Sequence, residues 1–339
     1  MNPARYSLKA TAAALIRAWH EFFHRPCDGR VCAAVRIVYG LLVLIHLAVL
    51  YPDLDLWFTD GGLLPLERAR EAVSPYAWSL FEYLPGVSAV VHTCYWIAVA
   101  HSAAFLVGFL PRINAFFLFV WIVSFQNRNN LINDGEDTLL RMLGFLMIWL
   151  PSGRCWSANA LIRRWWSAHH NTPQPATTFD QCAVPGWGLR LVQLQMAVLF
   201  LSAGLSKLSG DAWFNGTALY YVSRLDDHFG RFWVPAWMFD TPWLVAFVTW
   251  SVVIVELAIP ILIWFRETRR PCLLAVLVFH LANEWTMNLF LFHWLMLCGW
   301  ISFLRPEDFS WLSHRAPGSG DARRSEPLET SEPIVEVRA

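Results

Sequence analysis

The stretch VCAAVRIVYGLLVLIHLAVLY, residues 31–51, decides the fold class of this chain. Arg36 is its one charged residue, and the remainder is almost entirely apolar. A helix needs about 20 such residues to cross a hydrocarbon core roughly 30 Å thick. The stretch therefore predicts a membrane-spanning helix.

The composition extends this prediction to the whole chain. Hydrophobic residues make up 56% of the 339 residues and charged residues 15%, whereas soluble domains carry about 25% charged residues. The formal net charge is +0 and no Lys/Arg-rich run occurs, which excludes a nucleic-acid partner. Further spans are predicted at 89–110, 113–126, 138–151, 187–206 and 242–265.

The run from 271 to 304 is too long for one untilted helix. Asn283 and Glu284 interrupt it, which predicts two short helices or one broken helix. We therefore expect an all-α integral membrane protein, a polytopic bundle of about seven or eight transmembrane helices plus interfacial helices.

Three segments follow from these patterns. Residues 1–30 form an N-terminal segment, in which 11–24 has the helical spacing of an amphipathic helix lying on the membrane surface. Residues 31–308 form the transmembrane domain, and 158–170 is a second interfacial helix within it. Residues 309–339 are rich in Pro, Ser and Glu, which predicts a disordered polar tail.

The arginines predict the orientation in the cell membrane. They gather in the N-terminal segment, in the connection 152–186 and at 266–270. Because cytoplasmic loops carry an excess of Lys and Arg, we expect these segments and the N-terminus to be cytoplasmic. The acidic loop 53–88 then faces outward, together with 127–137 and 207–241.

The sequence carries no signature of a metal or nucleotide enzyme. The 7 cysteines are scattered without a CxxC pair, so we interpret them mostly as small apolar residues, and their spacing supports neither a disulfide framework nor a metal site. The sequence also lacks HExxH, a histidine-rich box and GxGxxG.

Lysine is rare in this chain. Of the 26 Lys and Arg residues only two are lysines, Lys9 and Lys207. Arginine keeps its proton in a protein, whereas a desolvated lysine can become a neutral amine. Lys207, in FLSAGLSKLSGDAW, is therefore a candidate base. A lysine that snorkels from a helix end to the interface is the alternative, which residue type alone favours.

Other polar groups interrupt the predicted spans. Glu256 lies in the middle of VVIVELAIPIL and must be paired, protonated or functional. His280 and Asn283 are three residues apart and share one helix face, which favours a lined cavity. In the acidic and amide-rich segment 126–137, an Asp137–Arg141 ion pair at i,i+4 is the favoured interpretation.

Several motifs together resemble a known family. The stretches QLQMAVLFLSAGLSKLSGDAWFNGTALYYVSRL (193–225), IVELAIPILIWF (254–265), FHLAN (279–283) and FLFHWLML (290–297) resemble vitamin K-dependent gamma-carboxylase. The stretches RIVYGLLVLIHLAVLYPDLDLWFTDGGLLP (36–65) and NDGEDTLLRMLGFLMIWLPSGRCWS (133–157) are typical of HTTM proteins, the bacterial group with a horizontally transferred transmembrane domain. The resemblance covers about residues 10–308.

The resemblance implies a chemistry for these residues. It makes Lys207 the catalytic base toward reduced vitamin K or another quinol, used with O2 and CO2, and places His280 and Asn283 in the quinone cavity. We expect Glu256 and Asn133 to line the same cavity and no metal to take part. The sequence departs from the carboxylase at Ser206, where the carboxylase has a first lysine, and after Asn133, where no histidine follows.

Two functions remain open at this point. The first is a lyase-type membrane enzyme that carboxylates glutamate in a secreted peptide, with membrane lipids around it. The second is a non-catalytic HTTM module that assists maturation or export of a secreted peptide. A transporter using Glu256 and His280 is a weaker third, because the sequence shows no inverted repeat. For the enzyme, Lys207 should lie near the mouth of an outward cavity and His280 deeper.

Overall fold

The structure, a computed structural model, describes residues 8–72, 77–170, 182–225 and 228–309. The described residues up to Arg305 form one compact unit. The second unit begins at Pro306, and its described part is the short helix η6 (Pro306–Phe309). The expected disorder of 309–339 therefore falls almost entirely outside the described residues.

The described chain is helical almost throughout, which confirms the all-α class. The long helices are α1 (Leu8–His24), α2 (Gly29–Leu50), α5 (Ser88–Val107), α6 (Pro111–Arg128), α7 (Gly135–Trp149), α8 (Ala158–His169), α10 (Trp187–Leu208), α14 (Pro242–Leu262), α15 (Arg266–Thr286) and α16 (Phe292–Trp300). Short helices connect them: α3 (Leu54–Phe58), α4 (Leu66–Ala72), α11 (Asp211–Phe214), α12 (Ala218–Val222) and α13 (Trp237–Asp240). Strands β1 (Cys27–Asp28) and β2 (Ala183–Val184) form a two-stranded antiparallel ladder.

Four helical segments among the described residues are long and apolar enough to cross a membrane: Gly29–Phe58, Ser88–Val107, Trp187–Leu208 and Pro242–Leu262. A shorter apolar helix covers Phe292–Phe303. The chain is thus a membrane protein with several apolar helices, and the larger number of spans stays a prediction. Each predicted span nevertheless coincides with a helix to within a few residues.

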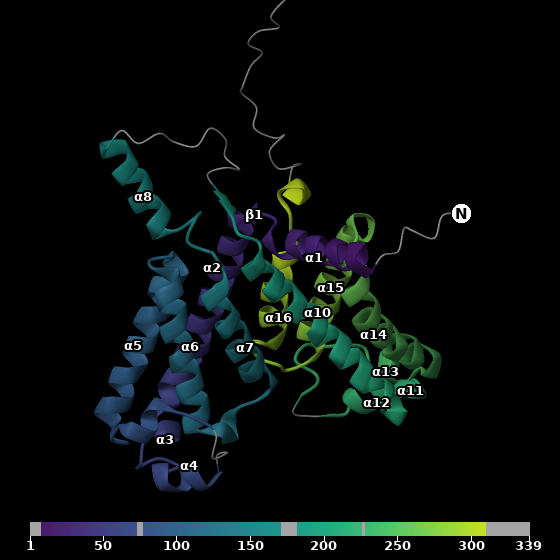
Figure 1. Cartoon of the computed structure of the whole chain (residues 1–339). Helices are drawn as coiled ribbons and strands as arrows, with labels where there is room; N and C mark the ends of the chain where they lie inside the picture. The colour runs from purple at the N-terminus through teal and green to yellow at the C-terminus, as the bar shows by residue number, and fades with distance from the viewer. Residues whose placement is uncertain (1–7, 73–76, 171–181, 226–227, 310–339) are drawn as a thin grey trace, which may run out of the picture. The chain divides into compact units, whose positions relative to one another are not determined.

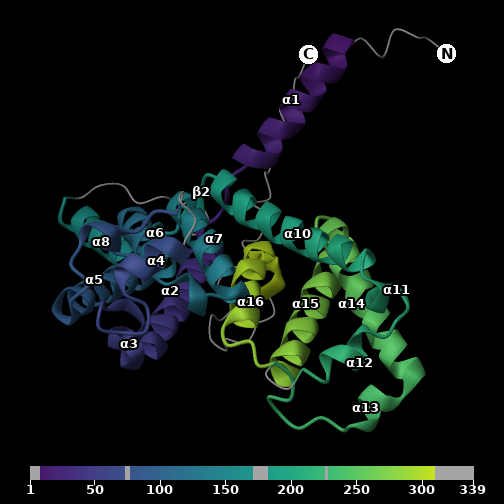
Figure 2. The ribbon, with the colours of Figure 1, turned by 90° about the horizontal axis from the view of Figure 1, so that it is seen from below.

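The helices of the first unit fall into two groups. Helix α2 packs against α5, α5 against α6 and α6 against α7, while α10 packs against α14 and α14 against α15. Helix α16 lies between the groups and contacts α2, α7, α10 and α15, as Figures 1 and 2 show. The buried Tyr39 hydroxyl on α2 donates to the Leu140 carbonyl of α7 over 2.8 Å, so it is not left unpaired in the apolar core.

The run 271–304 divides into two helices as expected, but Asn283 and Glu284 lie within α15 and the break follows them. Helix α15 ends at Thr286 and α16 begins at Phe292. A backbone bridge joins Met287 to Phe229, and the Asn288 amide donates to the His228 carbonyl over 2.8 Å. These bonds satisfy backbone groups at the break that neither helix can pair.

Two of the cysteines are paired, which the sequence did not predict. Cys155 and Cys182 form a disulfide across 27 positions of sequence. Cys182 directly precedes β2, which pairs with β1. Cys155 lies in the connection that follows α7, and this connection begins at the same end of the unit. The fold thus brings together two cysteines whose spacing carries no recognisable pattern.

Candidate functional site

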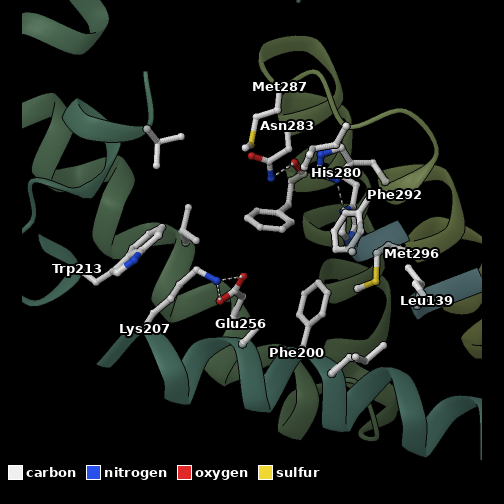
Figure 3. A pocket seen from close by; sticks show the side chains of 18 of the residues that line it. Leu139, Phe200, Lys207, Trp213, Glu256, His280, Asn283, Met287, Phe292 and Met296 are labelled. Carbon is white, nitrogen blue, oxygen red and sulfur yellow. Dashed lines mark hydrogen bonds and ion pairs between the residues drawn. The ribbon is translucent and has the colours of Figure 1, made fainter. Parts of the chain in front are cut away.

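A cavity of about 390 Å³ lies among α7, α10, α12, α14, α15 and α16. Its walls are mostly apolar and include Leu139, Met142, Phe200, Phe279, Phe292 and Met296. The charged or imidazole- and amide-bearing side chains that line it are Lys207, Glu256, His280, Asn283 and His293 (Figure 3). Ligand cavities commonly combine apolar walls with a few placed polar groups in this way.

The most polar feature of the cavity is an ion pair between α10 and α14. The Lys207 Nζ atom lies 2.9 Å from Oε1 and 2.7 Å from Oε2 of Glu256. The two side chains are 21% and 8% exposed. Nζ also lies 5.2 Å from the centre of the Trp213 ring, a cation–π contact. The Lys207 amine is thus held by a carboxylate and an aromatic face, and Figure 3 shows it turned toward Glu256.

Close packing of α10 on α14 makes this pair possible. At Gly204, an added Cβ atom would lie 2.8 Å from Leu257 Cδ2 and 3.2 Å from Glu256 Cβ. A residue without a side chain at this position therefore lets the two backbones approach each other. Lys207 follows in the last turn of α10, where a cation also interacts favourably with the helix dipole.

Two histidines meet at the other side of the cavity. The Nδ1 atoms of His280 on α15 and His293 on α16 are 3.2 Å apart, and both residues are buried. In such a contact between neutral rings one Nδ1 donates and the other accepts, so the two Nε2 atoms take opposite roles. Neither Nε2 has a hydrogen-bond partner among the described residues. The pair therefore keeps one donor and one acceptor unused, both buried away from the cavity surface.

His293 was missed by sequence reasoning. It lies in the run FLFHWLML, which was recognised for its resemblance but gave no role to the histidine. The signal that marks it is its contact with His280, which depends on how α15 and α16 fold back on each other. The helix break between them hides that contact from any fixed spacing.

The structure brings together four of the five predicted cavity residues. Lys207, Glu256, His280 and Asn283 line the same cavity, whereas Asn133 lines a neighbouring one. Asn133 precedes α7, and its Nδ2 donates to the Gln126 carbonyl over 2.8 Å. That bond holds the side chain on the α6 side of the first turn of α7.

The favoured Asp137–Arg141 ion pair is not formed among the described residues. The Asp137 carboxylate instead accepts from the Asp134 amide over 3.0 Å and from Gln126 Nε2 over 3.3 Å. The Asp134 side chain in turn caps α7, so the two aspartates form a capping box. Capping satisfies backbone donors that would otherwise be unpaired, which explains why Asp137 faces back rather than along the helix.

The cavity and the fold can be compared with known proteins. The sequence profile of the HTTM domain family matches residues 24–308, so the chain belongs to the HTTM domain family. It is 26% identical to the sporulation-delaying protein SdpB of Bacillus subtilis strain 168 over 210 residues. This match covers 59% of this chain and 60% of SdpB. It is 28% identical over 136 residues to the uncharacterized protein YitO of the same strain, 38% of each chain. The chain thus spans less than two thirds of either relative, and no solved structure matches it.

Proposed function

We propose that this protein is a membrane enzyme in which Lys207 acts as a base toward a reduced quinol, with carboxylation of peptide glutamate as the associated reaction. The observation that carries the proposal is the Lys207–Glu256 pair in an apolar cavity that also holds His280 and His293. An ion pair on the apolar helices of a membrane protein is costly to keep and is a functional candidate by default.

The residues present fit a quinol. A cavity of about 390 Å³ lies in the range of small-molecule sites, and its Phe and Met walls suit a flat apolar ring. His280, Asn283 and His293 are the imidazole- and amide-bearing side chains that border it. Reduced vitamin K or another quinol would supply an acidic hydroxyl on such a ring, with O2 and CO2 as co-reactants.

The pair gives Lys207 a route to the neutral amine. Glu256 holds the lysine in its ammonium form by accepting two hydrogen bonds. Transfer of one proton from Nζ to the Glu256 carboxylate leaves a neutral amine next to a carboxylic acid, and the low polarity of the walls favours this uncharged pair. Nζ can then accept a proton from a ligand hydroxyl. Glu256 is thus a positioning residue and proton acceptor for Lys207.

The test uses full-length protein purified into nanodiscs, given reduced vitamin K, O2, CO2 and a glutamate-containing peptide. We expect quinol oxidation by the wild type and a loss of at least about 100-fold in Lys207→Arg, the usual size of a general-base contribution. Arginine keeps the charge but not the removable proton. Arg224→Lys, an exposed change outside the cavity, is the matched control. Equal rates in wild type and Lys207→Arg would refute the base role.

A second candidate is a non-catalytic membrane module that assists maturation or export of a secreted peptide. The similarity to the sporulation-delaying protein SdpB over more than half of this chain favours it. In that case the Lys207–Glu256 pair is structural, and Lys207→Arg preserves function because arginine also binds a carboxylate. Extraction of the purified protein followed by mass spectrometry separates the candidates, since the enzyme is expected to retain a quinone.

A further inference from the structure

A groove of about 480 Å³ lies between the start of α6, the connection after α7 and helix α8. Three arginines line it, one from each of these segments: Arg112, Arg154 and Arg163. All three are exposed, and no Asp or Glu is among the described residues that line the groove. The groove therefore gathers positive charge on one surface without a carboxylate in its walls to neutralise it.

The arginine on α8 is held close to its neighbours. Arg163 Nη2 donates to the Arg154 carbonyl over 2.6 Å, which joins α8 to the connection after α7. Partial burial lowers the pKa of Arg163, and the charges of Arg154 and Arg164 lower it further. An anion in the groove would offset this repulsion, because an opposite charge favours the ionised form of a neighbouring group.

The backbone at the start of α6 adds to the positive potential. Leu110 precedes the helix with a left-handed φ of 40°, and no side chain among the described residues caps this end. The first amides of a helix have no intrahelical acceptor, and a helix N-terminus attracts anions. Arg112 is the second residue of α6, so its guanidinium group and the helix end act on the same part of the groove.

An independent feature connects the groove to lipid. Ile113 lines the groove, and it begins an exposed apolar stripe on α6 that continues through Phe116 and Phe117. Residues at i, i+3 and i+4 share one face of a helix. Because α6 is one of the predicted spans, we expect acyl chains to cover this face. The cationic groove thus opens at the end of a surface suited to lipid tails.

Helix α8 places the groove at the level of the lipid headgroups. Asn159 and Arg163, four positions apart, line the groove from the polar face of α8. The exposed apolar residues of α8 are Leu161, Ile162, Trp165 and Trp166. Tryptophan gathers at membrane–water interfaces, and an amphipathic helix with arginine beside its apolar face lies in the interface plane.

These features favour a phospholipid over a soluble anion. A free phosphate would use the arginines and the helix end, but it would have no use for the apolar stripe on α6. A phospholipid uses both, because its charged headgroup and its acyl chains are joined in one molecule.

We propose that this groove binds the phosphate headgroup of an anionic phospholipid whose acyl chains lie along Ile113, Phe116 and Phe117 of α6. Arg112, Arg154 and Arg163 neutralise the phosphate, whose oxygens match the planar fork of N–H donors on a guanidinium group. Basic pockets between membrane helices bind anionic headgroups in this way. The groove shares no residue with the Lys207 cavity, so the proposal does not depend on the proposed function.

The test is native mass spectrometry of the full-length protein in detergent, titrated with phosphatidylglycerol or with phosphatidylcholine of the same acyl chains. We expect phosphatidylglycerol to bind more tightly to the wild type. Arg112→Gln and Arg163→Gln should each weaken its binding about fivefold, the usual effect of one cation beside an anionic headgroup. Both side chains are exposed, so both variants should fold. Phosphatidylcholine binding should not change.

The matched control is Arg164→Gln. This arginine is the next residue of α8 and is also exposed, but it does not line the groove. Its loss should therefore leave phosphatidylglycerol binding within about twofold of the wild type, because exposed charges away from the site are screened. An equal loss in Arg164→Gln and Arg163→Gln would mean diffuse attraction to the whole helix and would overturn the proposal.

A soluble ligand distinguishes the lipid from free phosphate. Glycerol 3-phosphate carries the same phosphate chemistry without acyl chains, so at equal concentration it should not displace phosphatidylglycerol. Displacement would identify the groove as a site for a soluble phosphate and would contradict the lipid assignment. Equal affinities for phosphatidylglycerol and phosphatidylcholine, or an unchanged affinity in Arg112→Gln/Arg163→Gln, would also overturn it.

Discussion

The Lys207–Glu256 pair shows that the free-energy cost of burying a charged residue depends on whether its partner is present. Removing one partner of a buried pair leaves an uncompensated charge, which costs about 3–5 kcal/mol. Glu256→Leu should therefore lower the stability of the protein by about 3 kcal/mol, since Lys207 is largely enclosed. Glu256→Gln should cost less, because the amide oxygen still accepts from Nζ. Unfolding in detergent, followed by circular dichroism, measures both.

A double substitution provides the control for that prediction. In Lys207→Met/Glu256→Leu no charge is left without a partner, so the double variant should be more stable than Glu256→Leu alone. If the two single losses simply add, the residues are not energetically coupled and the pair is not what holds α10 and α14 in register at this site.

These residues also show how much of the candidate site could be predicted from the sequence alone. Lys207, Glu256, His280 and Asn283 were all identified in the sequence because an ionisable or amide group in an apolar span is costly and therefore conspicuous. Their partners were not identified. Glu256 lies 49 positions from Lys207, and His293 lies 13 positions from His280 across a helix break. Neither separation follows from a helical period.

At the scale of the helix, Gly204 sets the distance between α10 and α14. Alanine normally stabilises a helix interior by about 1 kcal/mol relative to glycine. At Gly204, however, the new Cβ would lie 2.9 Å from Leu257 Cγ, which is not the free end of the side chain. Overpacking costs about 1–3 kcal/mol, so Gly204→Ala should be destabilising by about 1 kcal/mol in thermal unfolding and should reduce any Lys207-dependent activity.

A second glycine provides the matched comparison. An added Cβ at Gly61 meets no atom within 4 Å, so Gly61→Ala should leave both stability and activity unchanged. If Gly204→Ala behaves like Gly61→Ala, α14 can move away freely and the close approach does not position Glu256.

The helix pair α15–α16 depends on the contact between its histidines. His293→Leu removes the partner of His280 Nδ1 and leaves a buried nitrogen unpaired, at a cost of about 1–3 kcal/mol. His280→Leu/His293→Leu removes both polar groups, so its loss of stability should be smaller than the sum of the single losses. Thermal unfolding of the four proteins gives the coupling, and additive losses would contradict the contact. Retention of a bound quinone should fall in all three variants.

Helix positions were predictable because the apolar runs are long and the bilayer fixes their length. The hydrogen bonds that cap the helix ends were less predictable. Asp137 was expected to pair with Arg141 along the helix, but it accepts from the Asp134 amide at the helix start instead. Both arrangements satisfy the sequence pattern, and the choice depends on where the helix begins. The small β1–β2 ladder likewise has too few residues to show a strand period.

At the scale of the whole first unit, the arginines and the disulfide point to different orientations. Figure 1 shows α1, β1 and α8 at one end of this unit and α3 and α4 at the other. The positive-inside rule places the first end, with its Arg-rich segments, in the cytoplasm. The same end carries Cys155–Cys182, and disulfides persist mainly in oxidising compartments. The arginines thus predict a cytoplasmic location for this end, whereas the disulfide predicts a location outside the cytoplasm.

Charge bias acts during insertion, whereas a disulfide forms afterwards in whichever compartment its cysteines reach, so we expect the arginines to decide. In intact cells Cys155 and Cys182 should then be reduced, and mass spectrometry after rapid alkylation should find both thiols modified. In a background without native cysteines, membrane-impermeant reagents should label Asp60→Cys and Tyr220→Cys from outside but not His20→Cys or Thr268→Cys. An intact disulfide in cells, together with external labelling of His20→Cys, would reverse the orientation and would contradict the outward opening expected for the Lys207 cavity.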